Sequence, residues 1–149
     1  MAKRTINDID LRGKRVLARV DYNVPMADKD GTMRINDDTR IRATLPTLRA
    51  MTESGAKVVL TAHLGRPKGE RVPSMSLRPV ADRLSELISQ PVAFCDQCVG
   101  QAATDAAAKL EDGGLLLLEN VRYHAEEEAN DPAFATQLAA DADVFVNDA

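Results

Sequence analysis

Short apolar runs of strand length alternate with segments of helical periodicity along almost the whole chain. The apolar runs, which we expect to be strands, cover residues 14–20, 57–61, 91–95, 115–118 and 144–146. Helical spacing of apolar side chains predicts helices over residues 40–55, 77–89, 99–110 and 132–142. Strands that alternate with helices in this way form a parallel sheet with right-handed crossovers. The pattern therefore predicts an α/β fold, a Rossmann-like parallel sheet with helices on both faces in three α/β/α layers.

The first predicted helix carries signals for both of its ends. Asp37 and Asp38 can cap its start, and Gly55 can end it. Pro46 lies inside this helix and cannot donate a backbone hydrogen bond, so we expect a kink or a restart there. A polar turn that includes residues 28–31 separates the first strand from this helix. The strand that follows the helix does not alternate between apolar and polar residues, so we expect it to be buried on both faces.

The balance of charges favours a small anionic ligand over a nucleic acid. The chain has 149 residues, and its 19 Lys and Arg against 23 Asp and Glu give a net charge of −4, so it offers no overall basic field. Aromatic residues make up only 3%, too few for an RNA-stacking platform. Most of the basic residues are arginines in the first half of the chain, and arginine grips carboxylates and phosphates with two parallel hydrogen bonds. We therefore expect an anionic small molecule as the ligand.

The sequence shows no membrane segment and no complete set of metal ligands. No run approaches the roughly 18 apolar residues of a membrane span, and the first residues lack the apolar core of a signal peptide, so we expect a soluble, cytoplasmic protein. Cys95 and Cys98 form the only cysteine pair, with His63 and His124 as the only histidines. A structural zinc site needs four ligands, so we expect ordinary reduced cysteines and no metal.

Polar residues gather where the predicted strands end, which is where open α/β sheets bind ligands. Cationic side chains that can bind a phosphate or carboxylate would meet at this edge of the sheet, beside side chains that can accept a hydrogen bond from a hydroxyl group. The cations are Arg40, His63, Arg66 and Arg122, and the acceptors are Asp21 and Asn23. Their common placement on one edge is the main signal for a functional site.

Each of these residues also has a purely structural interpretation. Asp21 and Asn23 can form turns after a strand, and Gly65 can simply permit a turn. His63 can be a structural histidine. Arg122 can pair with Glu126 or Glu127 on the surface, and Arg40 can pair with Asp37 or Asp38 at the start of its helix. The glycines do not form a nucleotide phosphate loop, because the G-x-x-x-x-G-K-[ST] pattern is absent.

Five segments also resemble a known family. RVDYNVP, DDTRIRATLPT, AHLGRPKG, LLLLENVRYH with the nearby EEE, and VNDA stand in the order and spacing of the N-terminal domain of phosphoglycerate kinase, over essentially the whole chain. The resemblance implies a two-domain glycolytic enzyme that transfers a phosphoryl group between 1,3-bisphosphoglycerate and ADP, giving 3-phosphoglycerate and ATP. The N-terminal half of that family binds 3-phosphoglycerate, and the C-terminal half binds the nucleotide with Mg2+.

The resemblance also implies roles for single residues. Asp21 and Asn23 resemble the partners of the substrate's hydroxyl and carboxylate groups, and Arg40 resembles the catalytic arginine that reaches the transferring group. His63, Arg66 and Arg122 resemble the basic residues that surround the 3-phosphate, and Leu64 and Gly65 belong to the same substrate-binding motif as His63 and Arg66. Two mild departures are Ala62, where many members have Ser, and Tyr22, where Phe is common.

The chain ends at Asn147-Asp148-Ala149, before the Gly-x-Ala-His-Arg stretch of the family. We therefore expect residues 1–149 to be a truncated N-terminal substrate-binding domain that lacks the nucleotide domain, binds no cofactor and no metal, and is inactive alone. We also expect a monomer that binds neither nucleic acid nor membrane. Two alternatives stay open: a non-catalytic α/β module for a phosphorylated metabolite or dinucleotide, and an interaction or metal-carrying protein built on Cys95 and Cys98. The glycine-free turn DYNVP argues against a dinucleotide.

Overall fold

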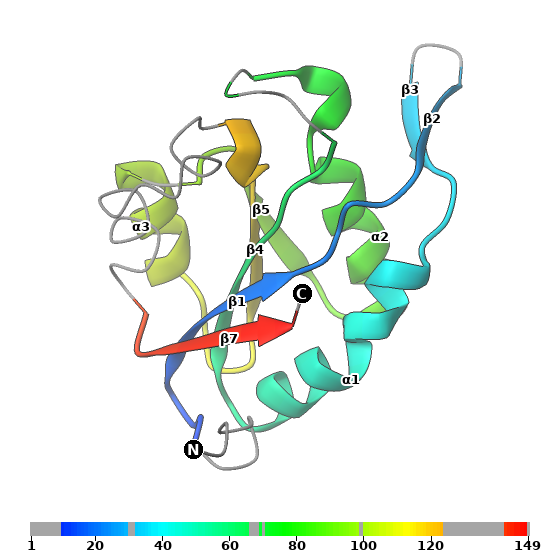
Figure 1. Ribbon diagram of the computed structural model, residues 1–149. Helices are drawn as coiled ribbons and strands as arrows, with labels where there is room; N and C mark the ends of the chain where they lie inside the picture. Colours follow the sequence, from blue (N-terminus) through cyan, green and yellow to red (C-terminus); the bar gives the residue numbers. More distant parts are fainter. Residues whose placement is uncertain are drawn as a thin grey trace, which may run out of the picture.

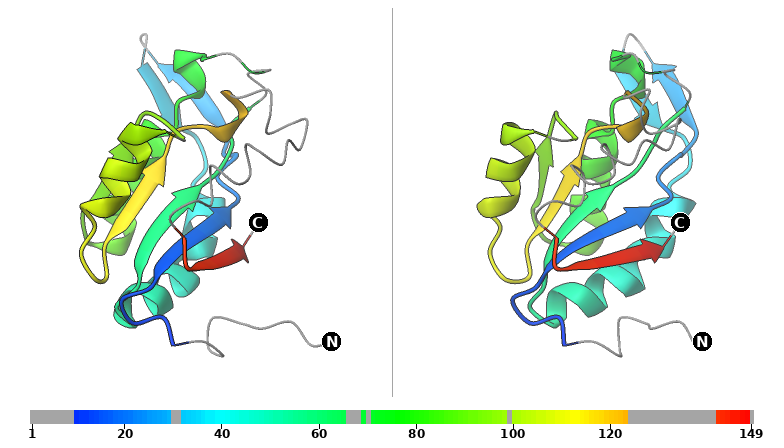
Figure 2. Two further views of the ribbon diagram at one scale, coloured as in Figure 1. Left: turned by 90° about the vertical axis from the view of Figure 1, so that its left-hand side faces the viewer. Right: turned by 60° about the vertical axis from the view of Figure 1, so that its left-hand side comes forward.

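The computed structural model describes residues 10–29, 32–65, 69, 71–98, 100–123 and 142–148. Its centre is a five-stranded, fully parallel sheet in the order β5-β6-β4-β1-β7. The strands are β1 (Arg15–Val20), β4 (Lys57–Thr61), β5 (Val92–Cys95), β6 (Leu115–Leu118) and β7 (Val144–Asp148). They lie side by side and point the same way (Figure 2). The predicted α/β fold with a parallel sheet is confirmed.

Helices cover both faces of the sheet. Figure 1 shows α1 (Thr39–Glu53) and α2 (Arg78–Ile88) on one side and α3 (Gln101–Ala108) on the other. This division follows from right-handed crossovers, because the chain moves toward one edge from β1 to β4 and β5, and turns back from β5 to β6. The helix predicted over residues 132–142 falls almost wholly outside the described residues.

The larger part of the core lies between the sheet and the first two helices. It joins Val16 and Ala18 of β1 to Leu60 of β4, with Leu48 of α1 and Leu84 of α2 packed against them. A smaller cluster under α3 contains Cys95, Ala103, Leu116 and Leu118. The central strand β4 is buried more completely on the first face than on the second, where Val59 is only half-buried. The prediction that this strand is buried on both faces therefore agrees fully with the face covered by α1 and α2, and only in part with the face under α3.

Helix α1 begins and ends where its sequence signals predict. Asp37 Oδ1 accepts hydrogen bonds from the Thr39 backbone N–H at 2.8 Å and from its hydroxyl at 2.5 Å, and the hydroxyl is the larger cause of the lowered pKa of Asp37. Gly55, with φ of 84°, follows the last turn and donates to the Thr52 carbonyl. The helix continues through Pro46 without the predicted restart. Because Pro46 is exposed, water can solvate the carbonyl that its missing N–H leaves without a donor.

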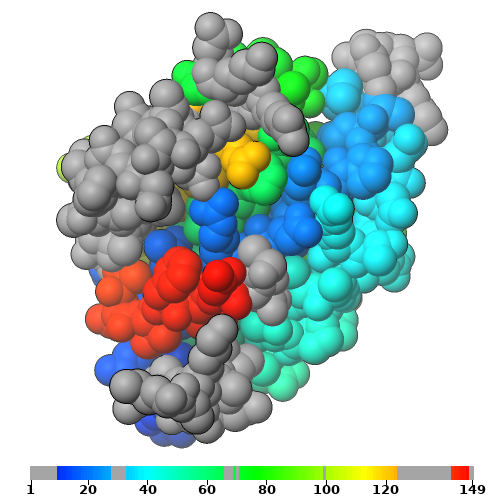
Figure 3. Space-filling model, viewed as in Figure 1, coloured from blue at the N-terminus to red at the C-terminus, as the bar shows by residue number. Residues whose placement is uncertain are grey.

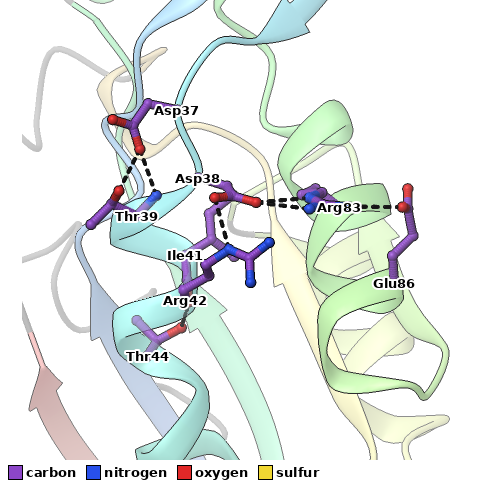
Figure 4. Close-up of polar contacts among 8 residues, drawn as sticks. All are labelled: Asp37, Asp38, Thr39, Ile41, Arg42, Thr44, Arg83 and Glu86. Atoms are coloured by element: carbon purple, nitrogen blue, oxygen red, sulfur yellow. Dashed lines mark hydrogen bonds and ion pairs between the residues drawn. The ribbon is translucent and has the colours of Figure 1, made fainter.

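Asp38 connects two helices instead of capping one with its side chain. Its carboxylate accepts from Arg42 Nε at 2.9 Å and from Arg83 of α2 at 2.9–3.0 Å, as Figure 4 shows. Hydrogen bonds from Arg42 and then Arg83 lower the pKa of Asp38. Arg83 Nη1 also contacts Glu86 at 3.0 Å. Asp38 therefore stabilises the packing of α1 against α2.

Two kinds of short element were not predicted. Residues 28 and 29, part of the expected polar turn, lie in β2 (Met26–Lys29), which pairs antiparallel with β3 (Thr32–Ile35). The other elements are single 3-10 turns, η2 (Pro73–Met75) and η3 (Val121–Tyr123). Within the described residues, no helix is long and apolar enough to cross a membrane.

Candidate functional site

The candidate site lies where the strand order of the sheet reverses. The chain leaves β4 toward the β5 edge, but it leaves the neighbouring strand β6 toward the β7 edge. Ligands of open α/β sheets bind outside the carboxyl ends of the strands at such a switch point. The segments that follow β4 and β6 carry His63 to Gly65 and Glu119 to Arg122, and β1 lies directly beside β4. Most of the predicted site residues therefore meet at one edge.

Arg40 joins the loop after β1 to the start of α1. Its Nη1 donates to the carbonyl oxygen of Asn23 and lies 3.5 Å from Asp21 Oδ1. Asp21 Oδ1 also accepts from the Asn23 N–H at 3.2 Å, which is the turn that the structural interpretation anticipated. Arg40 thus pairs with Asp21 across the loop, whereas Asp38, one of its expected partners, holds Arg42 and Arg83.

The loop after β4 is tied to the loop after β1 through its backbone. The Gly65 N–H donates to Asn23 Oδ1 at 2.9 Å. Gly65 has φ of +64°, and a Cβ there would lie 3.1 Å from the sulfur of Met75, so both its conformation and its surroundings favour glycine. The Leu64 side chain is buried in the core, so only its backbone is placed to serve the site.

Of the remaining predicted cations, His63 and Arg122 lie in described segments and Arg66 does not. His63 and Arg122 are half-buried residues of the segments that follow β4 and β6. Two backbone bonds fix these segments to each other, from Val121 N to the Ala62 carbonyl and from Gly69 N to the Arg122 carbonyl, both 3.1 Å. Arg66 lies outside the described residues.

Sequence reasoning did not select Arg19, the half-buried next-to-last residue of β1. It stands in register with Thr61 of β4 and Asn147 of β7, so a polar row crosses the sheet near its carboxyl ends. The Thr61 hydroxyl is buried and has no hydrogen-bond partner within the described part of the chain. The signal available in the sequence was a charged residue inside the apolar run at residues 14–20.

Sequence reasoning also left the buried pair Glu119 and Asn120 without a role. Glu119 is 3% exposed, and its carboxylate accepts from the Ser76 hydroxyl at 2.6 Å and from the Leu77 and Asn120 N–H groups at 2.8 Å. This places a carboxylate at the start of α2, where negative charge is stabilised. Two polar side chains directly after an apolar strand were the signal for this network.

Tyr123 and Arg71 fasten the chain between β4 and α2 to the end of η3. The Tyr123 hydroxyl donates to the Val72 carbonyl at 2.6 Å, and the Arg71 guanidinium lies 5.4 Å from the centre of the Tyr123 ring. Burial, with a smaller contribution from Glu119, raises the pKa of Tyr123 to about 12. The phenol is therefore neutral at physiological pH and remains a hydrogen-bond donor.

The site's charge suits an anion. Three arginines and a histidine belong to segments at this edge of the sheet, Arg19 near the end of β1, Arg40 at the start of α1, His63 after β4 and Arg122 after β6. In the part of the chain that the structure describes, no group of three or more His, Cys, Asp or Glu side chains could hold a metal ion. Cys95 and Cys98 are buried thiols, and Cys98 Sγ donates to the Glu119 carbonyl at 2.8 Å.

Comparisons with known proteins point to one family. Residues 6–149 match the family model described as phosphoglycerate kinase. Curated relatives with that name include those of Rippkaea orientalis, 58% identical, and Caulobacter sp. strain K31, 56% identical; each aligns with 100% of this chain and 37% of its own length. The chain thus spans little more than a third of these relatives.

Two solved structures share the fold. The phosphoglycerate kinase of Pyrococcus horikoshii has a TM-score of 0.84 and 36% identity, covering 97% of this chain and 36% of its own. The enzyme of Coxiella burnetii has a TM-score of 0.81 and 35% identity, covering 96% of this chain and 34% of its own.

Proposed function

The chain belongs to the phosphoglycerate kinase family, as its motifs predicted, and we propose that it is the part of such an enzyme that binds 3-phosphoglycerate and 1,3-bisphosphoglycerate. Residues 1–149 would form the N-terminal substrate-binding domain. The complete enzyme would transfer a phosphoryl group between 1,3-bisphosphoglycerate and ADP, giving 3-phosphoglycerate and ATP. We place this glycolytic reaction in the cytoplasm and expect the protein to be a monomer.

The observation that supports the proposal best is the convergence of cations on the switch point between β4 and β6. Arg40, His63 and Arg122 come from three separate segments that hydrogen bonds join. The Arg40 side chain donates to the Asn23 carbonyl, the Gly65 N–H donates to the Asn23 side chain, and backbone hydrogen bonds link the segments that follow β4 and β6. A small anion of three or four charges needs such a preorganised set of donors, because charge-assisted hydrogen bonds are the strong ones. We assign the 3-phosphate to His63, Arg122 and Arg66.

Asp21 and Asn23 are the proposed partners of the substrate's hydroxyl and carboxylate groups. The Asn23 carbonyl and Oδ1 already accept from Arg40 and the Gly65 N–H, so its amide nitrogen is the atom it can offer to a carboxylate. Asp21 is half exposed and can accept from a hydroxyl. Each residue therefore has a polar atom of the required kind at the edge of the loop after β1.

Arg40 is the proposed catalytic residue. Its side chain is 49% exposed and that of Asp21 46%, and ion pairs this exposed contribute little. Arg40 can therefore exchange Asp21 for a phosphoryl group at small cost. It stands at the start of α1, where the backbone N–H groups add positive potential. Phosphoryl transfer relies on such positive charge beside the moving group.

The described residues do not suit Mg2+, because the site's side chains are mostly cationic and the described residues hold no group of three or more His, Cys, Asp or Glu side chains that could bind a metal ion. We therefore assign Mg2+ and the nucleotide to the nucleotide-binding domain of the complete enzyme.

Calorimetric titration of the 149-residue chain with 3-phosphoglycerate tests the proposal. We expect binding that Arg122→Ala weakens by roughly ten- to a hundredfold, because a charged hydrogen bond contributes about 1.5–3 kcal/mol. Arg49→Ala is the matched control, since Arg49 is exposed and its guanidinium makes a single, 3.4 Å hydrogen bond within the described residues, to the Leu87 carbonyl. Absence of binding by the folded chain at millimolar ligand, or equal losses in the two variants, would contradict the proposal.

A further inference from the structure

Asn120 connects three segments of the site with one side chain. It is 0% exposed, and its Nδ2 donates to the Leu64 carbonyl at 2.7 Å and to the Met75 carbonyl at 3.0 Å. Its Oδ1 accepts from the Arg122 N–H at 3.0 Å. The partners belong to the loop after β4, to η2 and to η3. No other side chain described above joins as many parts of the site.

The hydrogen bonds determine how the amide is oriented. Two carbonyl oxygens face Nδ2, and one N–H faces Oδ1. If the amide were turned over, its oxygen would meet the two carbonyls, and its NH2 group would meet the Arg122 N–H. Both hydrogens of Nδ2 are used, so a side chain without two donors cannot reproduce the arrangement. An isosteric carboxylate would place negative charge against two carbonyl oxygens.

The donor side of Asn120 fixes the turn at Gly65 from two directions. The Leu64 carbonyl and the Gly65 N–H belong to the same peptide group, and the Met75 sulfur lies 3.1 Å from the place that a Gly65 Cβ would take. Gly65 in turn holds Asn23 through its N–H. A shift of the Leu64 or Met75 backbone would therefore move the Gly65 N–H and the Asn23 amide together.

The acceptor side of Asn120 determines how the chain enters η3. The bond from Arg122 N to Asn120 Oδ1 closes a turn over residues 120–122, the usual way in which an Asn side chain directs the backbone two residues later. The direction of the Arg122 side chain depends on this backbone. One amide group thus controls both Arg122 and the Gly65 turn.

We propose that Asn120 is the positioning residue of the anion site: it holds the Gly65 turn and the Arg122 backbone in register, so that one buried amide sets both the Arg122 segment and the loop that carries His63. This inference rests on the proposed function, because it takes the phosphate of 3-phosphoglycerate as the ligand. Asn120 itself is buried and does not touch the ligand.

The test compares Asn120→Asp with Gln90→Glu in the 149-residue chain. Gln90 is the matched control, because its Nε2 also donates to a backbone carbonyl, that of Gly113 at 3.0 Å, but at the opposite end of β6. By analogy with residues that support metal ligands, we expect Asn120→Asp to weaken 3-phosphoglycerate binding by about tenfold or more. Gln90→Glu should change Kd by less than about twofold. The amide NMR signals of Gly65 and Arg122 should shift only in Asn120→Asp.

The outcomes separate positioning from general stability. Each Kd is measured on protein shown to be folded by circular dichroism, well below its melting temperature, where a merely structural role would leave Kd unchanged. If Asn120→Asp does not fold, Asn120→Ser, which keeps one uncharged donor, replaces it with the same expected direction. Wild-type binding together with an unchanged Kd in the variant would overturn the inference alone. No binding by the wild-type chain would overturn the proposed function as well.

Discussion

Gly65 shows how a single residue without a side chain can shape an anion site. Its φ of +64° costs an L residue about 1–2 kcal/mol. We expect Gly65→Ala to lower the free energy of unfolding by about that amount and to weaken 3-phosphoglycerate binding, because an added Cβ would press on Met75 and displace the Gly65 N–H. Urea denaturation and calorimetry measure the two effects.

Gly13→Ala is the control for that experiment. Gly13 has φ of +69°, but a Cβ there would have nothing within 4 Å. Both variants should therefore lose similar stability, whereas only Gly65→Ala should lose affinity. Equal affinities in the two variants would show that the Gly65 turn does not position the groups that bind the ligand.

Arg40 should act on turnover more than on affinity. A chimera in which this chain replaces the matching part of the Rippkaea orientalis relative supplies the nucleotide domain, and we expect turnover in the chimera but none in the 149-residue chain. In the chimera, Arg40→Ala should lower kcat on the order of a thousandfold, as loss of an arginine finger does, with KM for 3-phosphoglycerate nearly unchanged. Arg49→Ala serves as the control in steady-state kinetics. A raised KM with unchanged kcat would place Arg40 among the groups that only bind the ground state.

The contact between α1 and α2 should make the fold sensitive to acid. Hydrogen bonds from Arg42 and Arg83 lower the pKa of Asp38, so its ionised form is favoured in the folded state. This contribution is present above about pH 3.9, the ordinary value for Asp, and is lost as the pH falls through the lowered pKa. Asp38→Asn should therefore lower the melting temperature by about 1–3 °C at pH 7 and by less at pH 3.

Asp82→Asn, which removes an exposed carboxylate elsewhere on α2, is the control for Asp38. Its effect on melting temperature should be smaller at pH 7. If Asp38→Asn and the wild-type chain lost stability in parallel between pH 7 and pH 3, the ion pairs of Asp38 would not contribute.

Elements with a clear apolar pattern were predictable from sequence, and elements without one were not. The strand at residues 115–118 and the α2 helix agree with prediction within a residue or two, because an unbroken apolar run and helically spaced apolar side chains leave little choice. The β2–β3 hairpin was missed, since its strands, MADK and TMRI, are neither unbroken apolar runs nor clearly alternating ones. Its signal was Asp30-Gly31 between Lys29 and Thr32, which are paired in the sheet.

The candidate site was predictable only as a set of residue types at the strand ends. Strand-end position identified Asp21 and Asn23, and the start of the first predicted helix identified Arg40; the structure places the three in contact. The partners of a side chain depend on how distant segments pack, which no local pattern encodes. For this reason the Arg40–Asp21 pair and the three bonds of Asn120 could not be foreseen.

At the scale of the whole molecule, the site's positive charge stands against a net charge of −4. Added salt weakens the repulsion between the ligand and the distant negative charges of the chain, since the Debye length is about 10 Å at 0.1 M. It also weakens, more gradually, the direct attraction between the ligand and the cations of the site. Because the charge-assisted contacts are the stronger influence, we expect the affinity for 3-phosphoglycerate to fall as salt rises from 50 to 500 mM. Calorimetry at several salt concentrations checks this, and an affinity that rises with salt would show that overall repulsion dominates.

The edge position of β7 has a consequence for the order in which the chain folds. β7 lies at the surface (Figure 3), and the bond from Arg15 N to Asp143 closes a loop of 128 residues, whereas β1 and β4 pair across about a third of that length. The longer closure costs roughly 1 kcal/mol more chain entropy. We expect pulse-labelled hydrogen exchange to protect the amides of β4 and β6 before those of β7, and simultaneous protection would argue against this order. The anion site, built on β1, β4 and β6, would then form while the last strand is still unpaired, and ligand could capture the chain before folding is complete.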